Sequence, residues 1–332
     1  MFIFDWIAIP FGYAMDFLYR ITNNYGVAVI LFSVLVALIM HPMNLKSAIN
    51  SYKKRRLAPY VTTIRSMYPN NLDMQNRMME HMYRDEKVSI TGGCLLSVVP
   101  VIILISMFCV LYSPLRFIYH LDVDTAAELT EHMKSIAPDL FSNSRGYAEL
   151  IAAQNISHYA EQIKALMPDL PGRVYEGINF NFLGINLAAA PQLGFTKWAD
   201  HSWGTIGLFC LPIVTALVQT IPSIVEYIKK IIAVFKNKDV KSVAKNPSTW
   251  MTPVSILITL VVAFMVPGAL SLYWLTKSLV HFALNEHIRW AIKKLPPDKT
   301  NLKELERISA EELAAEKGED KQDDKGETEY AE

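Results

Sequence analysis

Five long apolar stretches constrain this chain more than any other feature of its sequence. An α-helix needs about 20 mostly apolar residues to cross the ~30 Å of hydrocarbon in a bilayer. The stretches run from Gly26 to Met43, Cys94 to Tyr112, Trp203 to Ile224, Trp250 to Val266 and Ala269 to Asn285. The sequence therefore predicts an all-α polytopic membrane protein with five transmembrane helices, at residues 25–43, 94–112, 203–225, 249–266 and 267–288.

The last two stretches are interpreted as separate helices because a helix breaker divides them. No charged residue occurs from Asn246 to Thr276, a length too great for one ordinary span. Pro267 and Gly268 interrupt this segment, and neither residue favours a helix interior. We expect two helices joined by a tight turn here.

The charges between the stretches predict the side of the membrane that each connection faces. Residues 44–93 and 226–248 carry an excess of Lys and Arg, and so do the first residues after the last stretch. Residues 113–202 carry more Asp and Glu than Lys and Arg. Because cytoplasmic connections are enriched in Lys and Arg, we expect the N-terminus and the loop at 113–202 outside and the C-terminus in the cytoplasm.

The two ends of the chain differ in character. Residues 1–24 are rich in aromatic side chains and predict an interfacial helix on the outer leaflet, with a plain packing helix as the alternative. Residues 289–332 form a cytoplasmic tail that is strongly acidic after Pro297. This composition predicts a short polar helix that fades into disorder.

Bulk composition argues against two classes of function. The formal net charge is +0, so nothing in the overall charge indicates direct nucleic-acid specificity. The three cysteines, Cys94, Cys109 and Cys210, fall in predicted spans at no metal-like spacing. We expect no metal site and no cofactor, and we interpret the cysteines as small apolar packing residues.

The segment at 44–93 is predicted to be a cytoplasmic helical hairpin. Its turn falls at Tyr68-Pro69-Asn70-Asn71, where proline and two asparagines favour a chain reversal. Methionines crowd the tip and the returning helix, at Met67, Met74, Met78, Met79 and Met82. Flexible, polarizable methionines suit a surface that captures substrates of varied shape. The alternative is that they pack the two helices together.

At several points the chain resembles the YidC/Oxa1/Alb3 membrane protein insertases. The matching segments are Tyr25 to Leu31, Pro42 with Leu45-Lys46, Thr91 to Leu95, Phe182 to Leu187 and Pro267 to Trp274. The resemblance covers roughly residues 1 to 295, in order, with a matching topology. With a short outer loop, the chain looks most like the short insertases of Gram-positive bacteria.

The resemblance implies a location, a function and partners. Members of this family act in the bacterial plasma membrane as insertases and chaperones that pass nascent membrane segments from the cytoplasm to lipid. They use a hydrophilic groove and no covalent chemistry, so an enzyme is not expected. The implied partners are nascent membrane proteins and the lipid bilayer, with the Sec translocon and the ribosome as further candidates. Some relatives hold ribosomes with a basic tail, which the acidic tail here does not resemble.

One position departs from the family pattern. Most relatives carry a groove arginine in the first span, and the resemblance places Ala37 there. Lys277 lies roughly 12 Å into the fifth span and Ala37 roughly 16 Å into the first, so their depths are similar. We hypothesise that Lys277 replaces the missing charge. The alternatives are that Lys277 snorkels or that the fifth span ends earlier.

Polar residues inside the predicted spans are further groove candidates. They are Ser97, Ser106, Thr215, Gln219, Thr220, Ser255, Thr259, Tyr273, Thr276, Ser278 and His281, of which Gln219 and His281 are the strongest. His41 precedes Pro42 at a helix end and is interpreted as interfacial. Ser and Thr often bond their own helix backbone instead, which is the alternative for most of these positions.

Two other classes of function stay open. An assembly scaffold that kept the insertase fold and lost insertion activity is supported by Ala37. A transporter or channel is less favoured, because no internal repeat is visible. The sequence names no substrate and leaves Sec dependence, oligomeric state and the role of the outer loop undetermined.

Overall fold

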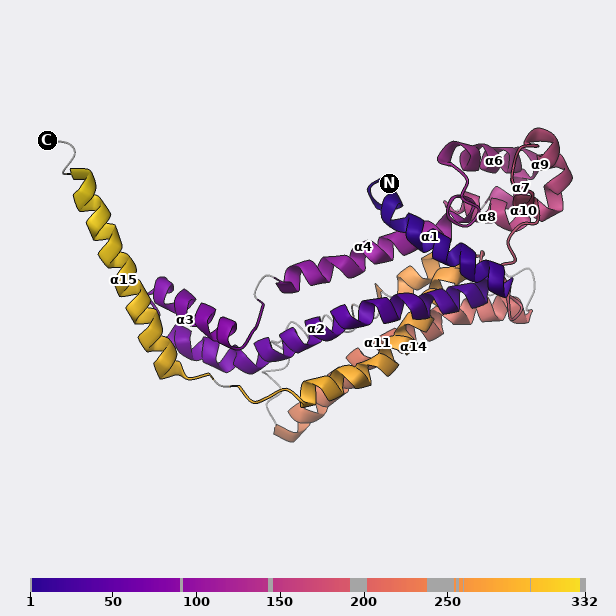
Figure 1. The fold of residues 1–332 in the computed structure, drawn as a ribbon. Coiled ribbons are helices and arrows are strands. Elements are labelled where there is room, and N and C mark those ends of the chain that lie inside the picture. The colour runs from indigo at the N-terminus through magenta and orange to yellow at the C-terminus, as the bar shows by residue number, and fades with distance from the viewer. Residues whose placement is uncertain are drawn as a thin grey trace. The chain divides into compact units, whose positions relative to one another are not determined.

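The computed structural model describes residues 2–89, 92–142, 146–191, 202–237, 254, 257–258, 260–298 and 300–328. Its regular structure is almost entirely helical (Figure 1). The chain divides into two compact units. The first unit holds residues 1–39 and 101–283, and the second holds residues 40–100 and 284–332.

The first two helices are joined by a short polar link. Helix α1 spans Phe2–Thr22 and helix α2 spans Tyr25–Met67. The Asn24 side chain accepts a hydrogen bond from the Val27 amide at 3.2 Å, which caps the start of α2. Helix α2 has 43 residues, so it continues beyond the predicted span at 25–43 and includes the first arm of the hairpin.

The continuation of α2 through Pro42 has a local reason. A proline removes one backbone hydrogen bond and crowds the preceding turn, but it does not forbid a helix whose other residues favour one. The segment after Pro42 is rich in Leu, Ala, Lys and Arg, which are strong helix formers. The predicted boundary at residue 43 is therefore a change in polarity and not the end of a helix.

Three further apolar segments are helical. Helix α4 spans Gly92–Tyr112, helix α11 spans Trp203–Asn237 and helix α14 spans Gly268–Lys293. Helix α11 passes the predicted end of its span at residue 225. Of the predicted span at 249–266, residues 260–265 are helical and most of the remainder lies outside the described residues.

The break between that segment and α14 falls at Pro267, as the sequence indicates. The amides of Gly268 and Ala269 donate to the carbonyls of Ala189 and Leu187, both at 2.9 Å. A Cβ on Gly268 would lie 2.9 Å from the Leu208 Cδ1 atom. The start of α14 therefore packs closely against residues 187–189, and a glycine leaves room for that approach.

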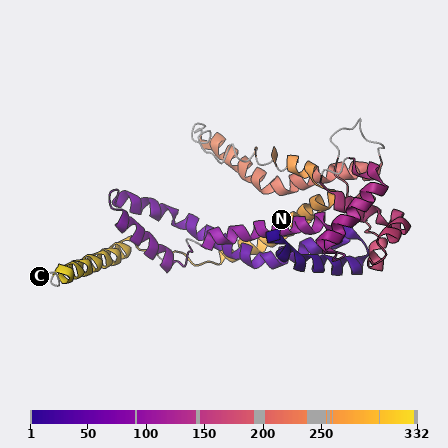
Figure 2. The ribbon, with the colours of Figure 1, turned by 90° about the horizontal axis from the view of Figure 1, so that it is seen from above.

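The described residues between 114 and 175 fold as a cluster of short helices in the first unit, as Figures 1 and 2 both show. The helices are α5 (Pro114–Phe117), α6 (Val123–Ile136), α7 (Pro138–Phe141), α8 (Ala148–Asn155), a 3-10 turn (Ile156–Tyr159), α9 (Ala160–Leu166) and α10 (Gly172–Tyr175). Leu129, Met133, Leu150 and Ile163 are fully buried among them. The amphipathic pieces of this segment therefore form a small apolar core.

A two-stranded hairpin follows this cluster. Strand β1 (Asn181–Phe182) pairs antiparallel with β2 (Ile185–Asn186), and Phe182 lies opposite Ile185. Leu183 and Gly184 both have positive φ, at 53° and 81°. Two such residues match the tight turn that joins short antiparallel strands. This hairpin is the one exception, within the described residues, to the predicted all-α structure.

The second unit contains the predicted cytoplasmic hairpin and a C-terminal helix. After a turn at residues 68–71, helix α3 spans Leu72–Asp85, and Asn71 caps it by accepting from the Met74 amide at 3.0 Å. Helix α15 spans Leu302–Thr328, which is longer than the short helix expected for the tail. The three helices share a core that includes Leu57, Met78 and Leu305.

Two helices in the described part of the chain are long and apolar enough to cross a membrane by length and composition. They are α2 and the part of α11 from Trp203 to Ile221, and the shorter helical stretch Val101–Tyr112 is apolar as well. The count of five spans remains a prediction.

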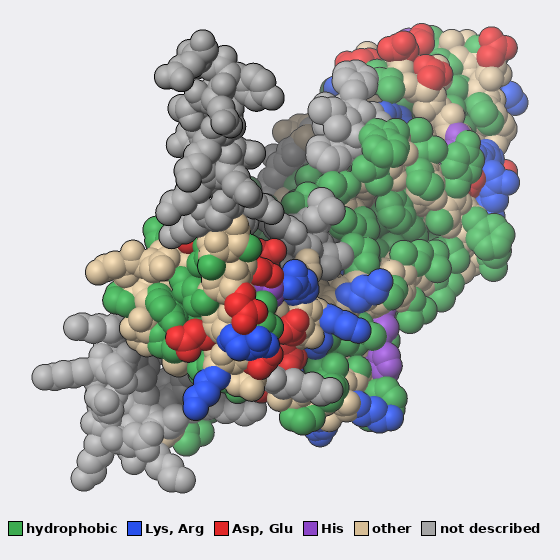
Figure 3. Space-filling model, turned by 60° about the vertical axis from the view of Figure 1, so that its left-hand side comes forward, with side chains coloured by type: hydrophobic (Ala, Val, Ile, Leu, Met, Phe, Trp, Pro, Cys, Tyr) green, Lys and Arg blue, Asp and Glu red, His purple; other side chains and the backbone are tan. Residues whose placement is uncertain are grey.

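Apolar side chains are exposed along these helices. On α11 they recur at Ile206, Val214, Leu217, Ile221, Val225, Ile228 and Ile232. The stripe covers about 39 Å of helix at ~1.5 Å per residue. Figure 3 shows hydrophobic side chains gathered broadly over one face. A soluble protein rarely exposes so continuous an apolar surface, whereas lipid covers it without cost.

Candidate functional site

Three polar side chains form a row on α14, which we call the polar row: Tyr273, Lys277 and His281. They are spaced by four residues, so they lie on one face of the helix. Their exposure increases along the helix, since Tyr273 is fully buried, Lys277 is half-buried and His281 is exposed. The row thus extends from the packed interior of the first unit to its surface.

Lys277 is the central member of the polar row. Its Nζ atom lies 5.9 Å from the centroid of the Tyr273 ring, near the outer limit of a cation–π contact. Over the ranges that the structure describes, no carboxylate forms an ion pair with Lys277, and the buried Tyr273 hydroxyl has no hydrogen-bond partner. A cation inside an apolar helix without a counter-charge marks a candidate site.

Two of the predicted groove residues form hydrogen bonds to helix backbone. The Thr215 hydroxyl donates to the Leu211 carbonyl at 2.8 Å and reaches the Ser271 carbonyl at 3.1 Å, which joins α11 to α14. Ser106 donates to the Ile102 carbonyl of its own helix at 3.0 Å. These contacts match the alternative that Ser and Thr satisfy helix backbone.

The other predicted groove residues have mixed positions. Gln219, Thr276 and Ser278 are half-buried, and Thr220 is buried and donates to the Ala216 carbonyl at 2.7 Å. Ser255, Thr259 and the side chain of Ser97 lie outside the described residues.

Ala37 is packed in the first unit, at 7% exposure, while the next two residues of α2 are exposed. The cysteines were expected to be small packing residues, and Cys109 is buried whereas Cys210 is exposed. His41 belongs to the second unit, where its Nε2 atom lies 2.8 Å from His287 Nδ1. His41 is therefore half-buried and lies beside another histidine.

The five methionines of the hairpin divide between core and surface. Met74, Met78 and Met82 are buried in the core of the second unit, and Met79 packs against it. Met67 is 41% exposed. Residues of α15 share this core, so the hairpin and the C-terminal helix bury the methionines together, and Met67 is the member of the set on the surface.

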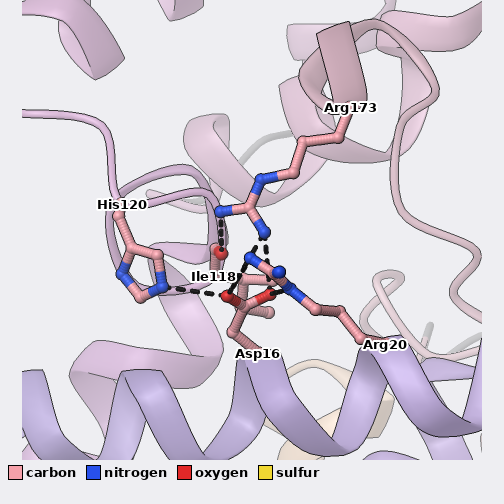
Figure 4. A network of polar contacts seen from close by, with 5 residues as sticks. All are labelled: Asp16, Arg20, Ile118, His120 and Arg173. Atoms are coloured by element: carbon pink, nitrogen blue, oxygen red, sulfur yellow. Dashed lines mark hydrogen bonds and ion pairs between the residues drawn. The ribbon is translucent and has the colours of Figure 1, made fainter. Parts of the chain in front are cut away.

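A second polar cluster, which the sequence did not indicate, lies in the first unit (Figure 4). Arg20 binds both carboxylate oxygens of Asp16 at 2.9 Å, and Arg173 binds them at 3.0 and 3.2 Å. His120 Nε2 lies 3.0 Å from Asp16 Oδ2. Arg173 also donates to the Ile118 carbonyl at 3.1 Å. Asp16 therefore connects α1 to two parts of the segment at 113–202, which we call the outer segment after its predicted location.

The electrostatics of this cluster are set by competition at Asp16. Burial by itself would raise the pKa of the carboxyl group, but hydrogen bonds from its three basic partners outweigh burial and lower the pKa. The one local signal in the sequence was the spacing of Asp16 and Arg20, four residues apart on a helix.

The cluster borders a cavity of about 740 Å³ between the end of α1 and the outer segment. Its walls include Tyr19, Tyr119, Gln154 and Glu176. None of the predicted groove residues lines this cavity. It belongs to the outer segment and is separate from the polar row.

Long helices with exposed apolar faces are typical of an integral membrane protein, and α14 adds a half-buried lysine with no carboxylate partner in the described ranges. The comparison with known families agrees with this class. The family described as "60Kd inner membrane protein" matches residues 17–294, and the chain belongs to that family.

Curated relatives are similar over a shorter region. The chain is 35% identical over 113 residues to the membrane protein insertase YidC of Syntrophobacter fumaroxidans, which is 34% of this chain and 20% of that protein. It is 32% identical over 114 residues to the YidC insertase of Geobacter sulfurreducens, covering 34% of this chain and 21% of the relative. The chain thus spans about a fifth of the length of the curated relatives it matches.

Proposed function

We propose that this protein is a membrane protein insertase and chaperone that moves nascent membrane segments from the cytoplasm into the bilayer through a hydrophilic groove. The observation that carries the proposal is Lys277, a half-buried cation in an apolar helix with no carboxylate partner in the described ranges. Two curated relatives are named as membrane protein insertases, which supports the same function.

The chemistry of the polar row suits this task. A polar tail that crosses a bilayer loses its hydration, and each unsatisfied or charged group costs several kcal/mol in hydrocarbon. Lys277, which is only half-buried, offers an acidic tail a partner part of the way across. The exposed apolar faces beside them let the hydrophobic part of the client reach lipid. No bond is made or broken, so the proposed activity is not enzymatic.

The proposed topology follows the charges of the connections. We place five spans across the bacterial plasma membrane, with the N-terminus and the segment at 113–202 outside and the hairpin and α15 in the cytoplasm. Nascent membrane proteins and lipid are the proposed partners. The Sec translocon and the ribosome would meet the basic cytoplasmic connections rather than the acidic tail.

The test is insertion of a single-span substrate with a short acidic outer tail into vesicles that contain this protein. If the cation lowers the crossing barrier by about 1.4 kcal/mol, Lys277→Ala slows insertion roughly tenfold. Adding Ala37→Arg should restore it, because the two positions have similar predicted depth. Lys294→Ala is the matched control, since Lys294 lies just after α14 and stacks on Trp290 with Nζ 3.7 Å from the ring centroid.

A second candidate function, a scaffold that binds membrane proteins without inserting them, is favoured by Ala37. Retained client binding with no insertion by the wild-type protein would support the scaffold. Ion or solute flux through the vesicles would favour a transporter. Insertion that is insensitive to Lys277→Ala would remove the lysine from the mechanism.

A further inference from the structure

Helix α15 lies along the hairpin through one apolar seam. Leu305 is 4% exposed and belongs to the same core as Met74, Met78 and Met82. Leu302 and Leu313 pack against this core from the same helix. Their spacing of three and eight residues around Leu305 places all three leucines on one face. The C-terminal helix thus covers the methionine-lined side of the hairpin.

Ser309 lies one turn after Leu305, on the same face of α15. This residue is 0% exposed, and its hydroxyl has no hydrogen-bond partner among the described residues. A buried hydroxyl without a partner weakens an interface. The contact between α15 and the hairpin is therefore weaker than it would be with a hydrogen-bond partner for Ser309.

Polar pairs hold the far end of the contact. His81 Nε2 lies 2.7 Å from Glu312 Oε2, and Arg77 lies 3.6 Å from the same carboxylate oxygen. The Tyr68 hydroxyl donates to Glu306. The hydrogen bond from His81, together with the positive charges nearby, lowers the pKa of Glu312, although burial opposes this.

The residues just before α15 are also bound to the hairpin by polar contacts. Arg56 donates to the Pro296 carbonyl at 2.7 Å and lies 3.5 Å from Asp298. The Tyr60 hydroxyl donates to Asp298 at 2.8 Å. Acidic groups of the tail thus meet basic groups and hydroxyls of the hairpin, and Figure 3 shows acidic and basic side chains adjoining one another in this region.

The contact between α15 and the hairpin is suited to displacement of α15 by another helix. It combines a narrow apolar seam with ion pairs that are partly exposed, and such pairs are weak and are screened by salt. The opposite face of α15 satisfies its own charges, because Arg307 binds Glu304 at 2.9 Å and Glu311 at 3.0 Å. If α15 left the hairpin, Arg307, Glu304 and Glu311 would therefore stay paired with one another.

The surface beneath α15 has the chemistry of a site for an amphipathic acidic helix. Three methionines form its floor, and methionine adapts to partners of different shape. Arg56, Arg77 and His81 lie at its border and face carboxylates of the tail. A partner with an apolar seam and acidic flanks would satisfy the same groups as α15 does.

We propose that α15 is an intramolecular occupant of this surface, and that an amphipathic acidic helix of a nascent client displaces it and docks on the methionines. The proposal rests on the proposed insertase function for the identity of the client. It does not rest on that function for the existence of the docking surface. The acidic tail then acts as a cover that keeps the methionine surface out of water until a client arrives.

The first test measures whether α15 covers the methionines. Full-length protein is treated with hydrogen peroxide, and oxidation of Met78 and Met82 is followed by mass spectrometry, with the exposed Met67 as the internal reference. Leu305→Glu should expose the two buried methionines and raise their oxidation rate about tenfold, because a charge cannot remain in the seam. Ala310→Glu adds the same charge on the exposed face of α15 and should leave the rate unchanged.

A second variant guards against simple misfolding of the hairpin. Glu306→Lys with Glu312→Lys reverses the charges of the tail and leaves every apolar core residue in place. It should raise oxidation of Met78 and Met82 in the same direction, with a helical circular dichroism signal equal to that of the wild type. Unchanged protection in both variants would overturn the proposal.

The second test measures docking. The probe is a fluorescent peptide with the sequence of residues 300–315, which carries the leucine seam and the acidic flanks of α15. Its affinity for the full-length Leu305→Glu protein should exceed that for the wild type about tenfold, since the intramolecular occupant is gone. The same peptide with Lys in place of every Glu should not bind.

The two hypotheses fail in different ways. Equal binding of the peptide to the wild type and to Leu305→Glu would overturn the docking surface. Binding as expected, together with no insertion of the single-span substrate by any variant, would overturn the proposed function and leave the docking surface intact.

Discussion

At the scale of single residues, Asp16 is a buried charge whose loss should lower the stability of the protein. It is 5% exposed and is bound by Arg20, Arg173 and His120 (Figure 4). Asp16→Asn would leave two guanidinium groups without their carboxylate, and Arg20 is largely exposed and can rehydrate. We expect a loss of roughly 1–3 kcal/mol in the free energy of unfolding, measured by denaturant titration in detergent.

The pH dependence of this loss follows from the lowered pKa of Asp16. A carboxyl group with a lowered pKa in the folded state stabilises the protein above its unfolded-state pKa, near ~3.9. That stabilisation is lost as the pH falls through the lower folded-state value. The gap between wild type and Asp16→Asn should therefore be full at pH 7 and shrink below about pH 4. The matched control is Asp139→Asn, because Asp139 is exposed on α7, and a similar loss there would refute this account.

Residue types indicated the candidate site only in part. The charge and position of Lys277 could be read from an uncharged stretch that it terminates, because a lysine inside an apolar helix has few structural explanations. The role of Thr215 could not be read from the sequence, since its partner Ser271 lies on another helix, 56 positions away. The same holds for Asp16 and Arg173, which are separated by 157 positions. Contacts of this kind depend on tertiary packing that no local pattern contains.

At the scale of elements, the first turn of α2 packs against the β1–β2 hairpin. A Cβ on Gly26 would overlap the ring carbons of Phe182. The two residues belong to separate segments that resemble the insertase family, and this contact gives both a physical reason. Their shared role is to let the outer segment approach the start of a membrane helix closely.

This close approach predicts a coupling between the two positions. Gly26→Ala should destabilise the protein by about 1–3 kcal/mol, because the added methyl group must displace Phe182. The double variant with Phe182→Ala should recover at least ~1 kcal/mol relative to the sum of the single changes. Thermal unfolding in detergent measures all four members of the cycle. Additive effects would mean that the two elements do not press on each other.

Hydropathy predicted where helices occur but not where they end. Helix α2 continues to Met67 and α11 continues to Asn237, both far past the end of their apolar runs. Apolar composition reports the surroundings of a helix, whereas its end depends on caps and breakers such as Asn71 and the turn before it. The hairpin methionines illustrate the same limit, because α15 buries them from the far end of the chain.

At the scale of the whole molecule, the proposed topology rests on charge and on apolar surface. Basic connections at 44–93 and 226–248 are proposed to share one side of the membrane, and the cluster at 113–202 is proposed to face the other. The part of the exposed apolar stripe on α11 from Ile206 to Val225, about 29 Å of helix, is suited to lipid contact. These features are those of a membrane protein.

Cysteine labelling tests whether the number of spans between two positions is odd, as the proposed topology requires. Ser142→Cys places a thiol on an exposed position of the outer segment, and Asn301→Cys places one just before α15. The proposed topology puts three spans between them, an odd number, so they must face opposite sides. A membrane-impermeant maleimide should label Ser142→Cys in intact cells and label Asn301→Cys only after permeabilisation. The parent protein, with its native cysteines, gives the background. Labelling of both from the outside would require an even number of spans between residues 142 and 301, so that either α11 does not cross the membrane or the segment around the Pro267 turn crosses it only once.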